Sequence, residues 1–353
     1  MSPLTPGTGR YSSTGPARAW YPIARSSELG AEPLSARLFD TPLVAFRDER
    51  GGASVLLDRC PHRNTPLSLG RCVRGQLECA YHGWRFDGDG RCVEVPASVA
   101  SSSSTKTAAR HATHFPCQES QGLVWVWPRG EPDGAPYVIP GVNTPGYEIL
   151  EYDASFDATL YSTAENILDV PHTGFLHKGL FRGASRRHRV TVRVTRSQDR
   201  AEAEFIGEPR PEGVIGRLLA PRGGALTHVD RFIMPGIAQV EYALGEQSHV
   251  VVTNVLSPVS EFKTRMFTVV ALRLPLATSL VARVAEPIAR RIVDQDARIL
   301  KEQTRTTQEF GGEQFVSTEV DVLGSSILKL LRWGEQGSIP DVPPEVREVE
   351  MEI

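Results

Sequence analysis

A long apolar run is absent from this sequence, and so is an excess of positive charge. No stretch approaches the about 18 apolar residues that cross a membrane, and residues 1–20 lack the apolar core of a secretory signal. The formal net charge is −3 over 353 residues. These absences exclude an overall basic nucleic-acid binder, and they predict a globular protein with no nucleic-acid partner and no membrane span.

Cysteine is scarce, and the motifs of nucleotide binding are missing. Five cysteines, an odd number, in a chain with no visible signal favour reduced thiols or metal ligands and predict a cytoplasmic protein. Neither the glycine-rich dinucleotide fingerprint nor a phosphate loop occurs. We therefore expect neither a flavin nor a nicotinamide cofactor to bind within this chain.

Composition divides the chain into four parts. Residues 1–17 are rich in Pro, Gly, Ser and Thr and are predicted to form a flexible arm. Short strand-like runs separated by glycine-rich turns fill residues 18–130, and a Pro- and Gly-rich linker follows at 131–145. Residues 146–353 mix strands with helices. The predicted fold class is α+β, with an all-β N-terminal domain followed by an antiparallel sheet covered by helices.

The last of these parts contains the elements with the clearest patterns. A helix is predicted over Ser162–Val170, because Pro171 disfavours helical backbone in the residue before it. Helical periodicity also predicts helices near Leu280–Gln308 and Ser325–Trp333. The strand-like runs between the first two helices are Val190–Val194, Phe232–Leu244, Val250–Leu256 and Met266–Leu274.

The strongest chemical signal is a pair of Cys–His motifs. Cys60 and His62 lie in one turn, and Cys79 and His82 lie in another. Two thiolates and two imidazoles are the ligands of a Rieske [2Fe–2S] centre, in which two histidines replace two cysteines on one iron. A structural zinc site is the alternative. Zinc fingers usually pair Cys with Cys and His with His, so the order here favours the iron–sulfur cluster.

A second constellation surrounds His172 and His177. Two histidines and one carboxylate form the facial site of non-haem Fe(II) oxygenases, which leaves positions open for O₂. Five residues separate the two histidines, so they can reach one ion only if the helix is interrupted. Pro171 and Gly174 supply that interruption. Two histidines alone would equally fit surface or core positions.

The third ligand is predicted to be Asp296. At about 100° per residue on a helix, it falls within an apolar stripe that includes Ile292 and Ile299, whereas Asp294 falls among basic residues. A buried carboxylate is costly unless it is paired or binds a metal. Asp294 is therefore expected to be solvated and Asp296 to bind the ion.

These motifs resemble those of the Rieske non-haem iron oxygenases. The resemblance is carried by CPHRNTPLSLG and CAYHGWRFDGDGRC, in which Thr65 and Trp84 replace the disulfide cysteines of respiratory Rieske proteins. It extends to the spacing of Asn166, Asp169, His172 and His177 and to the residues around Gln295-Asp296. It makes 18–130 the Rieske domain and 146–353 the catalytic mononuclear iron domain.

The resemblance implies roles for two further residues. In this family the aspartate at the position of Asp169 links a cluster histidine of one subunit to an iron histidine of its neighbour; here these would be His82 and His172. The spacing of Asp169 and His172 agrees, because residues three apart share one helical face. A simple helix-end cap is the alternative. Asn166 is also expected to be catalytic.

The resemblance is to the short, α-only oxygenase components of the vanillate and dicamba O-demethylase type. It implies a monooxygenase that activates O₂ at mononuclear Fe(II) to hydroxylate or dealkylate a hydrophobic, ring-containing small molecule. A homotrimer is expected, and NAD(P)H would contribute electrons only through a separate reductase or ferredoxin. The alternatives are desaturation or oxidative cyclisation at the same iron, a pure electron carrier, and a regulatory binding protein.

Overall fold

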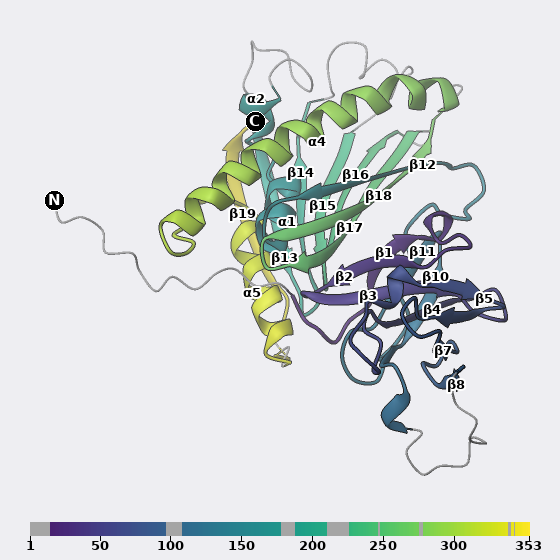
Figure 1. Cartoon of the computed structure of the whole chain (residues 1–353). Coiled ribbons are helices and arrows are strands. Elements are labelled where there is room, and N and C mark those ends of the chain that lie inside the picture. Colours follow the sequence, from purple (N-terminus) through teal and green to yellow (C-terminus); the bar gives the residue numbers. More distant parts are fainter. Residues whose placement is uncertain are drawn as a thin grey trace. The chain divides into compact units, whose positions relative to one another are not determined.

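The computed structural model describes most of the chain (Figure 1). The described residues are 15–96, 108–177, 188–209, 226–245, 248–274, 278–337, 340–341 and 343–353, and the side chains of 278–285 lie outside this set. The predicted arm at 1–17 lies outside the described residues except for its last three positions. Within the described part, no helix is both long enough and apolar enough to span a membrane.

The chain divides into two compact units. Ala17–Val138 form the first unit, and Ile139–Ile353 belong to the second. The boundaries predicted at 130 and 145 stay predictions. The α+β architecture predicted from the sequence is confirmed, because the first unit is built from strands with short 3₁₀ turns and the second from a large sheet with helices.

The described residues of the first unit form three small antiparallel sheets. The strand orders are β1-β11-β10, β2-β3-β4-β9 and β5-β6-β7-β8. Two apolar clusters fill this unit, one around Tyr21 and Val124 and the other around Phe46 and Leu67. The strands are β1 (Tyr21–Arg25), β2 (Leu34–Leu38), β3 (Thr41–Arg47), β4 (Ala53–Leu57), β5 (Arg71–Val73), β6 (Gln76–Glu78), β7 (Arg85–Phe86), β8 (Cys92–Glu94), β9 (His114–Phe115), β10 (Cys117–Ser120) and β11 (Leu123–Val126).

An eight-stranded antiparallel sheet forms the centre of the second unit, in the order β12-β18-β17-β16-β15-β14-β13-β19. Alternating burial explains these strands, since in β13 and β14 every second side chain enters the core. The strands are β12 (Glu148–Phe156), β13 (Arg189–Arg196), β14 (Arg200–Ile206), β15 (Leu226–Ile233), β16 (Ile237–Leu244), β17 (Ser248–Ser260), β18 (Lys263–Arg273) and β19 (Glu345–Glu352).

Helices pack on the sheet and share its core. Leu168 of α1 (Leu160–Leu168), Leu300 of α4 (Thr278–Glu309) and Leu330 of α5 (Gly324–Glu335) join one apolar cluster with residues of β13 to β18. The long α4 crosses the sheet in Figure 1, and the short α2 (Thr173–Leu176) follows α1. This packing matters for function because Asp296 lies in α4, and His172 and His177 lie at the two ends of α2, which follows α1.

One predicted strand is wrong. Phe232–Leu244 is not continuous, because residues 234–236 form a turn between β15 and β16. Pro235 lacks the N–H that a central strand needs. Gly236 has backbone and side-chain atoms so close that an added Cβ would lie 2.9 Å from the carbonyl oxygen of Leu256. Strands β12, β14 and β19 have no counterpart in the sequence prediction.

Two buried carboxylates hold a histidine inside this sheet. His228 Nδ1 lies 2.5 Å from Glu208 Oε2, and its Nε2 lies 3.0 Å from Asp230 Oδ1. The ring is also stacked between Phe205 and Tyr242. Burial works to lower the pKa of His228, but the two carboxylates overcome it and raise that pKa to about 9. The ring is therefore expected to be a cation at neutral pH.

Replacing His228 with leucine should destabilise the second unit by about 3–5 kcal/mol, because it leaves Asp230 buried without its partner. The raised pKa also sets a pH dependence. The stabilisation from His228 is full below its ordinary pKa of 6.5 and is lost as the pH rises through about 9. Urea titrations followed by circular dichroism at several pH values would measure both effects. The matched control is His111→Leu at an exposed position; equal midpoints for the two variants would contradict the prediction.

Candidate iron sites

Two similar loops in the first unit carry the Cys–His motifs. The Cys60 loop follows β4, and the Cys79 loop joins β6 to β7. In each loop the cysteine N–H donates to a backbone carbonyl further along, from Cys60 to Thr65 and from Cys79 to Trp84, both at 2.8 Å. Gly83 has a positive φ of 69°, which closes the second loop tightly beside His82. The backbone thus presents both motifs in the same way.

The four predicted cluster ligands gather between these loops. Cys60 and Cys79 are each 2% exposed, and the rings of His62 and His82 lie 4.5 Å apart. The ring of Trp84 stacks on His62 at 4.6 Å. Two buried thiols and two adjacent imidazoles are the donor set of a Rieske cluster. His82 is exposed, so one edge of this site reaches the surface of the unit.

The electrostatics of these residues also fit a cluster. Burial and the neighbouring Cys79 thiol raise the pKa of Cys60 to about 11, so two adjacent thiolates need a cation between them. His62 Nδ1 is buried and has no hydrogen-bond partner among the described residues. A buried polar atom without a partner is costly. Coordination to iron would satisfy both groups.

In the second unit, the helix is interrupted around Pro171 as the sequence predicted, whereas Gly174, the other predicted break, lies inside α2 (Thr173–Leu176). Helix α1 ends at Leu168, and its C-cap Asp169 has extended backbone with ψ of 106°. Helix α2 then occupies only four residues, with His172 and His177 at its two ends. Because α2 ends at Leu176, His177 leaves the helical path, and the centroids of the two rings lie 5.1 Å apart. A continuous helix would have turned them away from each other.

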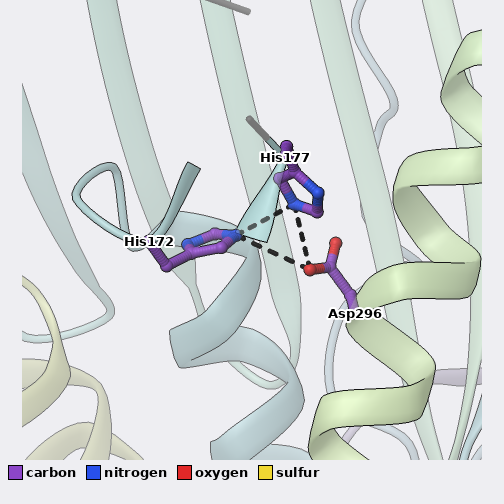
Figure 2. Close-up of side chains that lie close together, drawn as sticks. All are labelled: His172, His177 and Asp296. Carbon is purple, nitrogen blue, oxygen red and sulfur yellow. Dashed lines mark hydrogen bonds and ion pairs between the residues drawn. The ribbon is translucent and has the colours of Figure 1, made fainter. Parts of the chain in front are cut away.

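Figure 2 shows His172, His177 and Asp296 converging on one point. The Nε2 atoms of the two histidines are 3.2 Å apart. Asp296 Oδ1 lies 3.1 Å from His177 Nε2 and 3.6 Å from His172 Nε2. An ion bound at about 2.1 Å to each atom separates adjacent ligands by about 3 Å. The three donor atoms therefore have the spacing of one face of a coordination sphere.

The surrounding charges favour a cation at this point. Burial works to lower the pKa of His172, but the neighbouring carboxylates of Asp169 and Asp296 outweigh it and raise that pKa to about 9. Asp296 Oδ1 is buried and makes no hydrogen bond with the described residues, although it faces both imidazoles. The residues present fit a divalent metal held by two neutral imidazoles and one carboxylate.

Asp169 lies at the junction of α1 and α2 and contacts His172 through both its backbone and its side chain. Its backbone carbonyl oxygen lies 2.5 Å from the ring Nδ1. Its Oδ2 accepts the backbone N–H of His172 at 3.1 Å and lies 3.3 Å from the ring Nδ1. The carboxylate therefore both caps the start of α2 and contacts the ring nitrogen that faces away from Asp296. The link to a neighbouring subunit stays a prediction.

Helix α4 places Asp294 and Asp296 on different sides. Asp294 is exposed, and the Asp296 side chain is 13% exposed. The prediction that Ile299 shares the buried stripe is wrong, because Ile299 is 49% exposed. The side of α4 that packs on the core instead runs through Val293, Ala297 and Leu300, since these positions lie three and four residues apart.

The sequence indicated two further polar residues, Asn166 and Gln295, to different extents. Asn166 is 8% exposed, and its Oδ1 has no hydrogen-bond partner among the described residues. Its catalytic role stays a prediction. Gln295 was noted only as part of a motif, yet its Oε1 lies 2.9 Å from His177 Nδ1. Its position directly before Asp296 was the available signal.

Comparisons with known proteins agree with this organisation. Residues 19–113 match the Rieske [2Fe–2S] domain, and residues 156–333 match the vanillate O-demethylase oxygenase C-terminal domain. The oxygenase component of dicamba O-demethylase from Stenotrophomonas maltophilia is 37% identical over 45% of this chain and 47% of its own length. The 3-chlorobenzoate-3,4-dioxygenase oxygenase subunit from Comamonas testosteroni is 35% identical over 45% of this chain and 37% of its own length. The chain thus spans about half or less of the length of these curated relatives.

A solved structure shares the fold over nearly the whole chain. Dicamba monooxygenase bound to dicamba superimposes with a TM-score of 0.75 and 24% identity, over 90% of this chain and 98% of that protein. The two matched domains and the paired sites are those of the Rieske-type oxygenase class. The chain belongs to the Rieske non-haem iron oxygenase family, in the group with the vanillate O-demethylase type of C-terminal domain, which confirms the resemblance seen in the sequence.

Proposed function

We propose that this chain is the oxygenase component of a multicomponent Rieske monooxygenase. One observation carries the proposal: two imidazoles and one carboxylate converge within 4.8 Å in a chain that also contains a Rieske domain. An iron held by only three protein atoms keeps positions free for O₂ and substrate. A site that serves only structure would be closed by a fourth protein ligand.

The residues present would hold two iron groups. Cys60, Cys79, His62 and His82 would bind the [2Fe–2S] cluster, and His172, His177 and Asp296 would bind the mononuclear Fe(II). When bound, the cluster supplies single electrons and the ferrous ion activates O₂.

Around the ferrous site, the protein's own contribution is orientation and charge. Asp169 fixes the ring of His172 through Nδ1 and directs Nε2 toward Asp296. Asn166 lies one helical turn before Asp169. Its buried amide oxygen makes no hydrogen bond with the described residues. We propose that this oxygen accepts a hydrogen bond from a water or substrate group at the site.

The substrate and the partners are proposed from the family. Dicamba O-demethylase and 3-chlorobenzoate dioxygenase components act on the compounds in their names, and we propose a hydrophobic, ring-containing small molecule for this chain. Hydroxylation or oxidative dealkylation is the proposed outcome. We also propose a cytoplasmic homotrimer that receives electrons from NAD(P)H through a separate reductase or ferredoxin.

Desaturation or oxidative cyclisation would use the same residues, so only product analysis separates these outcomes. A pure electron carrier would not need a second set of iron ligands such as His172, His177 and Asp296. A regulatory binding protein would bind ligand without consuming O₂.

Substrate-dependent O₂ uptake with a surrogate reductase and a panel of chlorinated and methoxylated benzoates tests the proposal. Ligand binding without O₂ uptake above the protein-free rate would overturn it.

The cluster assignment predicts a visible property of the purified protein. It should be red-brown and, when reduced, should give a Rieske-type EPR signal, because histidine ligation distinguishes this cluster from an all-cysteine one. Cys60→Ser should abolish both the colour and the signal. Cys72→Ser is the matched control, since Cys72 lies outside both motif loops. A colourless protein with one zinc per chain after iron-replete growth would contradict the assignment.

A further inference from the structure

The buried ring of His177 has a partner at each of its two nitrogens. The residue is 1% exposed. On one side Nε2 lies 3.1 Å from Asp296 Oδ1, at the point where the three donor atoms converge. On the other side Nδ1 lies 2.9 Å from Gln295 Oε1. The partner at Nδ1 decides which nitrogen carries the ring proton.

An amide oxygen can only accept a hydrogen bond, so Gln295 Oε1 requires a proton on His177 Nδ1. The neutral ring then has its lone pair on Nε2, which is the atom that faces Asp296 and His172. The other ring is treated in the same way, since His172 Nδ1 lies beside the Asp169 carboxylate. Each imidazole thus has a hydrogen-bond acceptor beside Nδ1, and its Nε2 faces the point where the three ligand atoms converge.

We infer that Gln295 is a positioning residue that fixes the tautomer and orientation of His177 for metal binding. The inference rests on the proposed iron site. Acceptors behind metal-bound histidines commonly hold the ring in place and raise its basicity. Because Gln295 and Asp296 are adjacent on α4, a single helix supplies one ligand and positions another. The packing of α4 on the core therefore controls two of the three donor atoms.

The opposite orientation of the amide gives a competing arrangement. If the Gln295 amide N–H₂ group faced the ring, it would donate to His177 Nδ1, and Nε2–H would donate to Asp296. In that arrangement His177 Nε2 would carry the ring proton and would have no lone pair to offer a metal ion. The two arrangements respond differently to substitution, because glutamate can only accept at this position and methionine offers no strong acceptor or donor.

The test compares Q295E and Q295M in the full-length protein with its cluster oxidised. Cobalt(II) is the probe: its affinity is measured by competition with a chelator, and its geometry by low-temperature EPR. We expect Q295M to bind cobalt about 10–100-fold more weakly with an altered spectrum. Q295E should bind at least as tightly as the wild type with the wild-type spectrum.

If Gln295 serves only in helix packing, the cobalt affinities of the two variants should fall in the reverse order. Methionine matches glutamine in length and tolerates burial, so Q295M would then behave like the wild type, and Q295E would be weakened by its buried charge. The amide orientation that donates to His177 also predicts weaker binding for Q295E, relative to Q295M. Either order would overturn the inference.

Two controls separate this inference from the proposed function. D296A should lose cobalt binding at the site, and D294N should retain it, because Asp294 is exposed on the other side of α4. If D296A binds cobalt as tightly as the wild type, the iron site itself is wrong. If D296A fails and Q295M matches the wild type, the iron site stands and the role of Gln295 is rejected.

Discussion

Asp296→Ala should abolish substrate-dependent O₂ uptake and reduce the iron content by about one atom per chain while the cluster colour remains. Asp296 is the only carboxylate among the three converging donor atoms. Without it, two imidazoles would have to hold the ion alone, and the negative charge that favours a cation would be gone. Iron analysis and an oxygen electrode measure the two effects.

Asp294→Ala is the matched control for this variant. The residue lies two positions away on the same helix and is exposed. Its replacement should leave iron content and O₂ uptake within about twofold of the wild type, since exposed substitutions change stability little. Equal loss in both variants would mean that α4 as a whole is damaged. Loss only in Asp294→Ala would show that the carboxylate ligand has been assigned to the wrong residue.

Asp169→Asn should lower turnover by about 10–100-fold and keep the cluster and most of the mononuclear iron. The amide keeps the size of the side chain and one acceptor but loses the charge that contacts His172. A hydrogen bond to a charged group is worth about 1.5–3 kcal/mol, which is enough to loosen one ring without unfolding the unit.

The measurement for Asp169 is a single turnover. Reduced protein is mixed with O₂ and a substrate that the wild-type protein oxidises. The decay of the EPR signal of the reduced cluster is then followed by freeze quenching. A slow decay with full metal content is the expected result. Decay at the wild-type rate would show that Asp169 serves only as a helix cap. Glu165 would then be the next residue to replace, since burial raises its pKa to about 7 and it lies close enough for its charge to interact with that of His172.

The sequence was most informative where ligands lie close together in the chain. The loops of Cys60 and Cys79, and the break around Pro171 just before His172, could be predicted because proline and ligand spacing are local signals. Asp296 could also be found, since a single acidic residue on the inner side of a helix is unusual. These residues needed no knowledge of long-range packing.

What the sequence did not reveal depends on contacts between distant segments. The partner of His177 is 118 positions away at Gln295, and no local pattern indicates such a contact. The buried side of α4 was misjudged at Ile299 because the exact rotation of a helix depends on the surface beneath it. The His228 cluster was missed for the same reason, since its carboxylates come from the end of β14 and from β15.

The central claim is that one chain holds both a Rieske cluster and a separate ferrous ion. Mössbauer spectroscopy of protein grown on ⁵⁷Fe and reconstituted anaerobically with ferrous iron tests it most directly. The account predicts cluster iron and high-spin ferrous iron in a ratio of about two to one, with the ferrous component absent in Asp296→Ala. A wild-type spectrum that contains cluster iron alone would contradict the claim and would indicate that the chain is an electron carrier.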